Sequence, residues 1–170
     1  MRLVLEDERG QAAALAVFLI FLFALLFSGM VDLYRMQETR NWAYRAAESA
    51  ALAGAAAGRD FDSFVSGRMR IDPGLALTAA EETLQAALAW RGETDAAYDI
   101  RVLEYGGTIA DFPPVARSDL WGTSTEWTSN EPAVGVYLEV PVSTMFLGLG
   151  NGPVRVHAFA AAGCCGVLGK

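Results

Sequence analysis

The chain has 170 residues and a formal net charge of −7, a size that fits one ordinary domain or one anchor with a small domain. Residues 1–70 hold eight acidic residues and eight arginines, so the whole excess of negative charge lies in residues 71–170. This distribution argues against a nucleic-acid-binding protein, which needs a basic surface, and against adhesion to an anionic lipid surface.

Residues 12–31 (AAALAVFLIFLFALLFSGMV) contain no charged side chain. Twenty helical residues rise by about 30 Å, which is the thickness of a bilayer's hydrocarbon core. A buried core helix is one alternative, but a domain of this size has little interior to surround a helix that is apolar on every face. A cleaved signal peptide is another, yet the acidic residues 6–8 and the lack of a nearby A-x-A site do not fit it. We therefore predict one retained transmembrane helix, with the lipid bilayer as its partner.

The orientation of this helix in the membrane follows less directly from the sequence. Two arginines precede the span, and Arg35, Arg40 and Arg45 follow it, a count that mildly favours a cytoplasmic C-terminus. We still expect residues 1–10 to be a short cytoplasmic tail and the C-terminal part to be exported, because ten residues cannot form a domain.

The helix is predicted to continue past the membrane, so that residues 11–58 form one element ending at a capping glycine, Gly58. No proline interrupts residues 32–58, and Asp32/Arg35, Arg35/Glu38 and Arg45/Glu48 are helix-supporting pairs. The small residues Ala46, Ala50 and Gly54 step by four, which lets another backbone approach closely. Alternatively, these small residues have no packing role and only contribute to helix propensity. The two readings merge if the domain's own sheet packs on this face.

Residues 59–170 are predicted to form the extracytoplasmic domain, an α+β fold with a second helix and a three- to four-stranded antiparallel sheet. Asp72 and Pro73 fit the N-cap and first position of the helix, although Thr78 with Glu81 offers a competing capping box. The helix should run to about Trp90 and end at Gly92. Its inner face is predicted to hold Leu77, Ala80, Leu84 and Leu88. Period-two patterns predict strands at 98–105, 133–142 and 153–161, with Pro141 marking an edge or an end.

Residues 106–132 are predicted to be a long irregular stretch, broken by Gly106-Gly107 and Pro113-Pro114. Loops of this length are usually functional or disordered, but this one contains Phe112, Trp121 and Trp127. It either covers the sheet or forms a docking loop for a partner.

No residue set indicates catalysis, a metal site or a cofactor, so we predict a protein that is not an enzyme and has no evident small-molecule substrate. The lone histidine, His157, has no second histidine at metal-binding spacing and is predicted to be structural. The adjacent Cys164 and Cys165 are either buried thiols or a site of disulfide cross-linking to another chain. The glycine-rich residues 148–152 lack the Lys-Ser or Lys-Thr of a phosphate loop and predict a turn.

Residues 8–57 resemble the start of TadE/TadG-like proteins of Flp-type (tight-adherence) pilus systems. The shared features are Arg9-Gly10, one apolar helix, DLYR at 32–35 and the alanine-rich string RAAESAALAGAAAG at 45–58, followed later by VGVYLEVPVSTMF and VRVHAFAAA. The resemblance implies a pilin-like domain in the bacterial cytoplasmic (inner) membrane, exposed to the periplasm or exterior, with other pilus-system subunits as partners. Processed members have a Glu five residues after the cleaved Gly, whereas here Leu15 follows Gly10 at that distance. This departure favours an unprocessed, membrane-resident assembly role.

An accessory subunit of a larger membrane complex is the alternative function. Such a subunit of a respiratory or photosynthetic electron-transfer assembly would hold no cofactor and would stabilise its neighbours through its span and its aromatic loop. The unprocessed N-terminus and the small-residue helix face motivate this reading.

Overall fold

The computed structural model describes residues 3–60, 62, 70–114, 117–119, 122–124, 126–144 and 153–163. Its contacts divide the chain into two compact units. One comprises Met1–Gln37 and Val142–Val154, and the other comprises Glu38–Pro141 and Arg155–Lys170. The predicted long helix contributes to both units, so the domain includes Glu38 and the residues after it rather than beginning at residue 59.

Helix α1 spans Leu3–Ala57. It begins within the predicted cytoplasmic tail, which is therefore mostly helical, and it ends one residue before Gly58, as expected. Gly58 does not adopt the left-handed conformation of a capping glycine. Lack of space explains why a glycine stands here, because an added Cβ would lie 2.7 Å from both the Ala76 Cβ and the Ile71 Cγ2.

Helix α3 spans Pro73–Arg91. The Asp72 carboxylate caps it by accepting hydrogen bonds from the backbone N–H groups of Gly74 (2.8 Å) and Leu75 (3.0 Å), so the helix starts at the first of the two predicted sites. Gly92 ends it with φ 75°, and its N–H donates to the Ala89 carbonyl at 3.1 Å. This is the predicted glycine stop, and its positive φ explains the residue type.

The buried face of α3 differs from the prediction at one residue. Ala76, Ala80, Leu84 and Leu88 are buried, whereas Leu77 is 42% exposed. The four buried residues step by four along one face, and Leu77 lies about 100° further around the helix. The smaller Ala76 takes the inner position because α1 approaches closely there.

Three strands form the main antiparallel sheet, in the order β1-β6-β7. They are β1 (Ala97–Leu103), β6 (Ala133–Val142) and β7 (Val154–Gly163). The α+β fold is as predicted, with each strand found near its expected position. In the register of β1 and β6, Ile100 lies opposite Val136. Pro141 lies near the end of β6, beyond the residues that pair with β1, which explains why a proline is tolerated in a central strand.

Residues 106–132 are not wholly irregular, so this part of the prediction was wrong. Two small two-stranded sheets lie here, formed by β2 with β5 and by β3 with β4. The strands are β2 (Gly107–Ile109), β3 (Arg117–Asp119), β4 (Gly122–Ser124) and β5 (Trp127–Ser129). Three-residue strands are too short to produce a period-two pattern, which is why the sequence did not reveal them.

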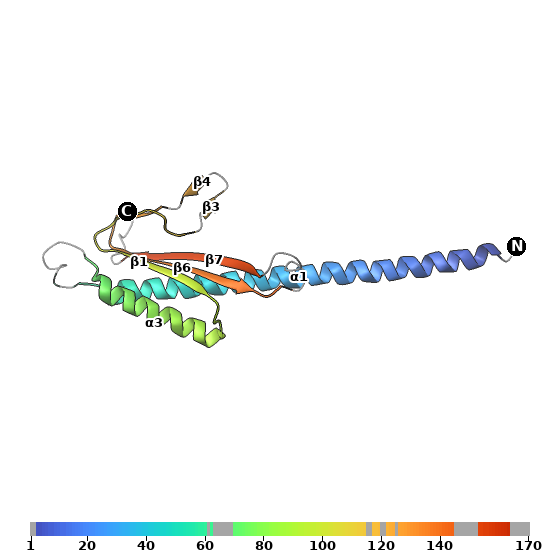
Figure 1. Cartoon of the computed structure of the whole chain (residues 1–170), viewed down its shortest axis with the longest axis horizontal. Helices are drawn as coiled ribbons and strands as arrows, with labels where there is room; N and C mark the ends of the chain where they lie inside the picture. Colours follow the sequence, from blue (N-terminus) through green and yellow to red (C-terminus); the bar gives the residue numbers. More distant parts are fainter. Residues whose placement is uncertain are drawn as a thin grey trace, which may run out of the picture. The chain divides into compact units, whose positions relative to one another are not determined.

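In the second unit, helices lie on one face of the main sheet (Figure 1). The core joins the alanines of α1, the inner face of α3 and alternate residues of β6 and β7. Its β6 members are Val134, Val136, Leu138 and Val140, and its β7 members are Ala158, Ala160 and Ala162. Small side chains on both α1 and β7 allow a close approach of helix to sheet.

Candidate interaction surfaces

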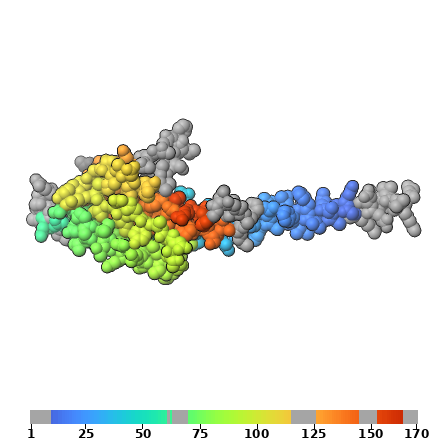
Figure 2. Space-filling model, viewed as in Figure 1, coloured from blue at the N-terminus to red at the C-terminus, as the bar shows by residue number. Residues whose placement is uncertain are grey.

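Most of the exposed large hydrophobic side chains of the described residues lie on the apolar part of α1. Its most apolar window of 18 residues has a mean hydropathy of 2.7 and is 0% buried. Phe18, Phe21, Phe23 and Phe27 are all at least 63% exposed, and Figure 2 shows the helix surface in blue. The described residues thus contain one helix that is long and apolar enough to cross a membrane, as the uncharged sequence predicted.

The small-residue series Ala46, Ala50 and Gly54 is buried within the protein's own domain. An added Cβ at Gly54 would lie 2.8 Å from the Ala76 carbonyl oxygen, 3.0 Å from the Ala80 Cβ and 3.3 Å from a Val134 methyl group. The neighbours that approach this face are therefore α3 and β6. The face serves close packing, but it does so inside the domain, so it is not a free surface for a partner.

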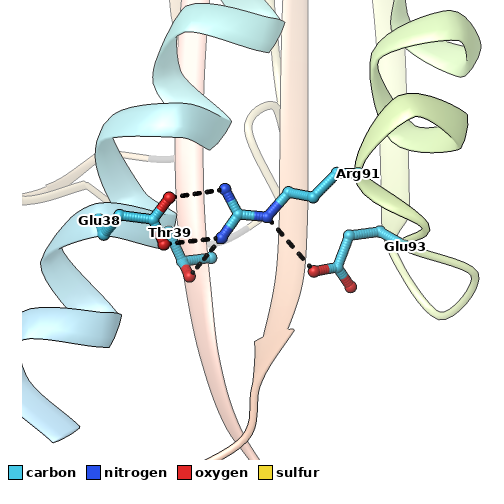
Figure 3. A network of polar contacts seen from close by, with 4 residues as sticks. All are labelled: Glu38, Thr39, Arg91 and Glu93. Carbon is cyan, nitrogen blue, oxygen red and sulfur yellow. Dashed lines mark hydrogen bonds and ion pairs between the residues drawn. The ribbon is translucent and has the colours of Figure 1, made fainter. Parts of the chain in front are cut away.

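Arg91 joins the end of α3 to α1 (Figure 3). Its guanidinium donates to both carboxylate oxygens of Glu38, at 3.1 and 3.0 Å, and to the Thr39 hydroxyl at 3.0 Å. The same group lies 4.5 Å from the centre of the Trp42 ring, and Glu93 approaches its Nε at 3.6 Å. A planar guanidinium can satisfy a carboxylate and stack on an indole together. Arg91 therefore fixes which turn of α1 lies beside the end of α3.

A second polar cluster connects β6 to β7 on the sheet face opposite the helices. Arg155 donates to Glu139 at 2.6 Å, and the Tyr137 hydroxyl shares a hydrogen bond with His157 Nδ1 at 2.7 Å. Tyr137 also donates to Glu139 at 3.2 Å. The hydrogen bond from Arg155 lowers the pKa of Glu139, while burial and the nearby Glu139 carboxylate raise the pKa of Tyr137 to about 12. His157 lies in this strand-to-strand network, consistent with the structural role predicted for it.

The raised pKa of Tyr137 predicts an alkaline loss of stability. The unfolded phenol ionises near pH 10 and the folded one near 12, so the folded state retains the proton longer and is destabilised as pH rises between these values. The loss is on the order of 2 kcal/mol. Urea unfolding at pH 9 and at pH 12 should show that Tyr137→Phe loses less stability over this range than the wild type. Equal losses in the two proteins would contradict this assignment.

Two aromatic side chains from residues 106–132, Phe112 and Trp127, cover the same sheet face. Phe112 is 1% exposed and Trp127 is 8% exposed, and both pack with Phe159 of β7, with ring centroids 5.5 to 6.1 Å apart. Gly135 of β6 makes room for them, because an added Cβ would lie 2.8 Å from Phe112 and 3.0 Å from Trp127. Phe112 and Trp127 therefore cover the sheet, which is one of the two predictions made for this stretch. Neither ring is exposed for docking to a partner.

Three sequence candidates lie outside the described residues: Trp121 of the docking-loop reading, and the two thiol candidates Cys164 and Cys165. Among the residues that are described, no group of three or more His, Cys, Asp or Glu side chains is arranged to hold a metal ion. Comparisons with protein-family models, curated proteins and solved structures give no match.

Proposed function

We propose that this chain is a single-pass, membrane-anchored structural protein that acts through protein–protein contacts, as a component resembling the TadE/TadG-like proteins of pilus assembly. The observation that carries this proposal is that the two halves of α1 have different surroundings. The helix exposes an uncharged apolar segment in its first half and supplies buried alanines to a folded domain in its second half. A soluble protein would hide that segment from water, since exposed apolar patches are normally small.

The polar groups of the domain support a structural role over a catalytic one. Arg91 connects α3 to α1, and Glu139 connects β6 to β7 through Arg155. Arg91 and Glu139 thus each have an ionic partner on a neighbouring element, an arrangement that fixes the positions of these helices and strands. We infer that the domain presents a stable surface to other subunits of its system.

The resemblance at residues 8–57 supplies the finer proposal. On the basis of that resemblance we propose that the chain lies in the bacterial cytoplasmic membrane with the domain exported, and that other pilus-system subunits are its partners. The absence of a Glu at position 15 favours a resident assembly component over a processed filament subunit.

Purification of the tagged protein from its native membranes in mild detergent tests this proposal. We expect secretion or assembly components of a pilus system to co-purify in fixed stoichiometry. The control is the same tag on an unrelated single-pass protein from the same membranes. Redox or pigment subunits in fixed stoichiometry would instead establish the accessory-subunit alternative. A chain that purifies alone would contradict both functions.

A further inference from the structure

The Tyr137 hydroxyl lies between two hydrogen-bonding neighbours but has only one proton. It lies 2.7 Å from His157 Nδ1 and 3.2 Å from Glu139 Oε2. An ionised carboxylate only accepts hydrogen bonds, whereas a histidine ring nitrogen either donates or accepts. Because one proton cannot serve two acceptors, both hydrogen bonds form together only if one neighbour donates to the hydroxyl oxygen.

Glu139 is not that donor, because its carboxyl group is ionised. Arg155 donates to its other oxygen, Oε1, at 2.6 Å, and this hydrogen bond lowers the pKa of Glu139. Tyr137 keeps its own proton, since burial raises its pKa to about 12. The phenol therefore donates to Glu139, and its oxygen accepts from His157. The network has one direction, from the Nδ1–H group of the histidine through the hydroxyl to the carboxylate.

The two nitrogens of the His157 ring have different surroundings. The ring is stacked on that of Tyr137, with an interplanar angle of 21° and centroids 6.1 Å apart. Tyr137 is only 4% exposed, whereas the His157 side chain is 40% exposed. No hydrogen bond joins Nε2 to any residue that the structure describes. When the neutral ring has its proton on Nδ1, Nε2 therefore carries a lone pair that is free to accept a hydrogen bond.

We propose that His157 is a proton-sensitive group whose neutral ring is held in the Nδ1–H form, so that Nε2 is an acceptor at the sheet surface and takes up the second proton on acidification. Both hydrogen bonds of the network survive this uptake, because Nδ1 is a donor in both states. Histidine is the side chain suited to such a change between pH 5 and 8. Contacts made at Nε2 are therefore pH-dependent: an N–H or O–H group fits the neutral ring, and a carboxylate fits the charged one.

The charged groups around His157 leave this part of the sheet neutral until the ring is protonated. Tyr137 and Glu139 face it from β6, and Arg155 lies beside it on β7. Glu139 Oε2 is 3.8 Å from Nδ1 and attracts the charged ring, while Arg155 is already bound to that carboxylate and repels the ring. Asp99 of β1 lies opposite Tyr137, one strand further away. Among the described strands none pairs with the other edge of β7. The second proton therefore makes a neutral cluster positively charged.

Nitrogen NMR of the full-length protein in detergent tests this inference, because the chain contains a single histidine. The protein is labelled with nitrogen-15 at histidine and purified through a tag that contains no histidine. At pH 8.5 the spectrum should show a protonated Nδ1 and a bare Nε2, and at pH 5 it should show both nitrogens protonated. At pH 5 the Nδ1 proton should exchange with water severalfold more slowly than the Nε2 proton.

Two substitutions and a control separate the network from general effects on the fold. Tyr137→Phe removes the acceptor of the Nδ1–H group, and Glu139→Gln replaces the carboxylate by a neutral amide, which accepts the hydroxyl proton less strongly. Each should raise the fraction of neutral rings with the proton on Nε2 severalfold. Arg101→Gln breaks the ion pair with Asp99 on the same sheet face and should leave the histidine spectrum unchanged.

A bare Nδ1 in the neutral wild-type protein would overturn the inference, since the hydroxyl would then donate to His157 instead of Glu139. Equal exchange rates of the Nδ1 and Nε2 protons at pH 5 would contradict it as well. So would a folded Tyr137→Phe protein that keeps the wild-type distribution of the proton. The wild-type spectra decide the question even if both variants fail to fold.

Discussion

Replacing Gly54 by leucine should strongly destabilise the extramembrane domain while leaving the anchor in the membrane. A single added Cβ would lie 2.8 Å from the Ala76 carbonyl oxygen and 3.0 Å from the Ala80 Cβ. The first of these atoms belongs to the backbone of α3 and cannot rotate away, so α1 and α3 must separate. Overpacking usually costs 1–3 kcal/mol, and we expect about 3 kcal/mol or more here because a whole leucine is added. That is a large share of the stability of a small domain.

Thermal unfolding in detergent, followed by tryptophan fluorescence, measures this loss. Gly29→Leu is the matched control, because it makes the same change on the same helix at a position where an added Cβ meets no atom within 4 Å. Helix propensity alone makes leucine more favourable than glycine by up to about 1 kcal/mol. The control should therefore unfold at or slightly above the wild-type temperature. If Gly54→Leu behaved like Gly29→Leu, the close packing of α1 on α3 would be refuted.

Two arginines in the middle of the span should abolish membrane integration. The proposed variant carries Phe18→Arg and Leu22→Arg, which lie one turn apart near the centre of the uncharged run. An arginine at the centre of a transmembrane helix costs about 2.5–3.5 kcal/mol, and each substitution also removes a favourable apolar residue. The total of about 6 kcal/mol or more exceeds what the remaining apolar side chains contribute.

Alkaline extraction of membranes from expressing cells measures integration. The wild type should stay in the pellet, and the doubly substituted protein should be released or degraded. Asn41→Arg with Ser49→Arg is the control, because it adds the same charge at exposed positions of α1 outside the span. If the variant with both arginines in the span stayed in the pellet as firmly as the control, the segment would not be a transmembrane helix.

The elements that could be predicted from sequence are those whose signal is local. The span is a continuous uncharged run. Asp72-Pro73 marks the start of α3, and Gly92 marks its end. The strands show alternation over several residues each, which is enough to expect an antiparallel sheet.

Contacts between distant residues were not predictable in this way. Glu38 was expected to pair with Arg35 one turn before it, yet it binds Arg91, which is 53 residues away in sequence. The Tyr137–His157 hydrogen bond depends on the pairing of β6 with β7, which no local pattern specifies. Gly58 and Leu77 show the same limit, because their roles are set by how closely α1 approaches α3.

Accessibility along α1 tests the account most directly. Single cysteines placed through residues 10–58 of the full-length protein, in a background lacking Cys164 and Cys165, can be reacted with a membrane-impermeant maleimide in vesicles. We predict an unbroken protected block from 12 to 31 and, beyond residue 37, reactivity that alternates between exposed positions such as Asn41 and buried ones such as Ala47. Helix-periodic reactivity within residues 12–31, in a chain that remains monomeric without detergent or lipid, would contradict the account.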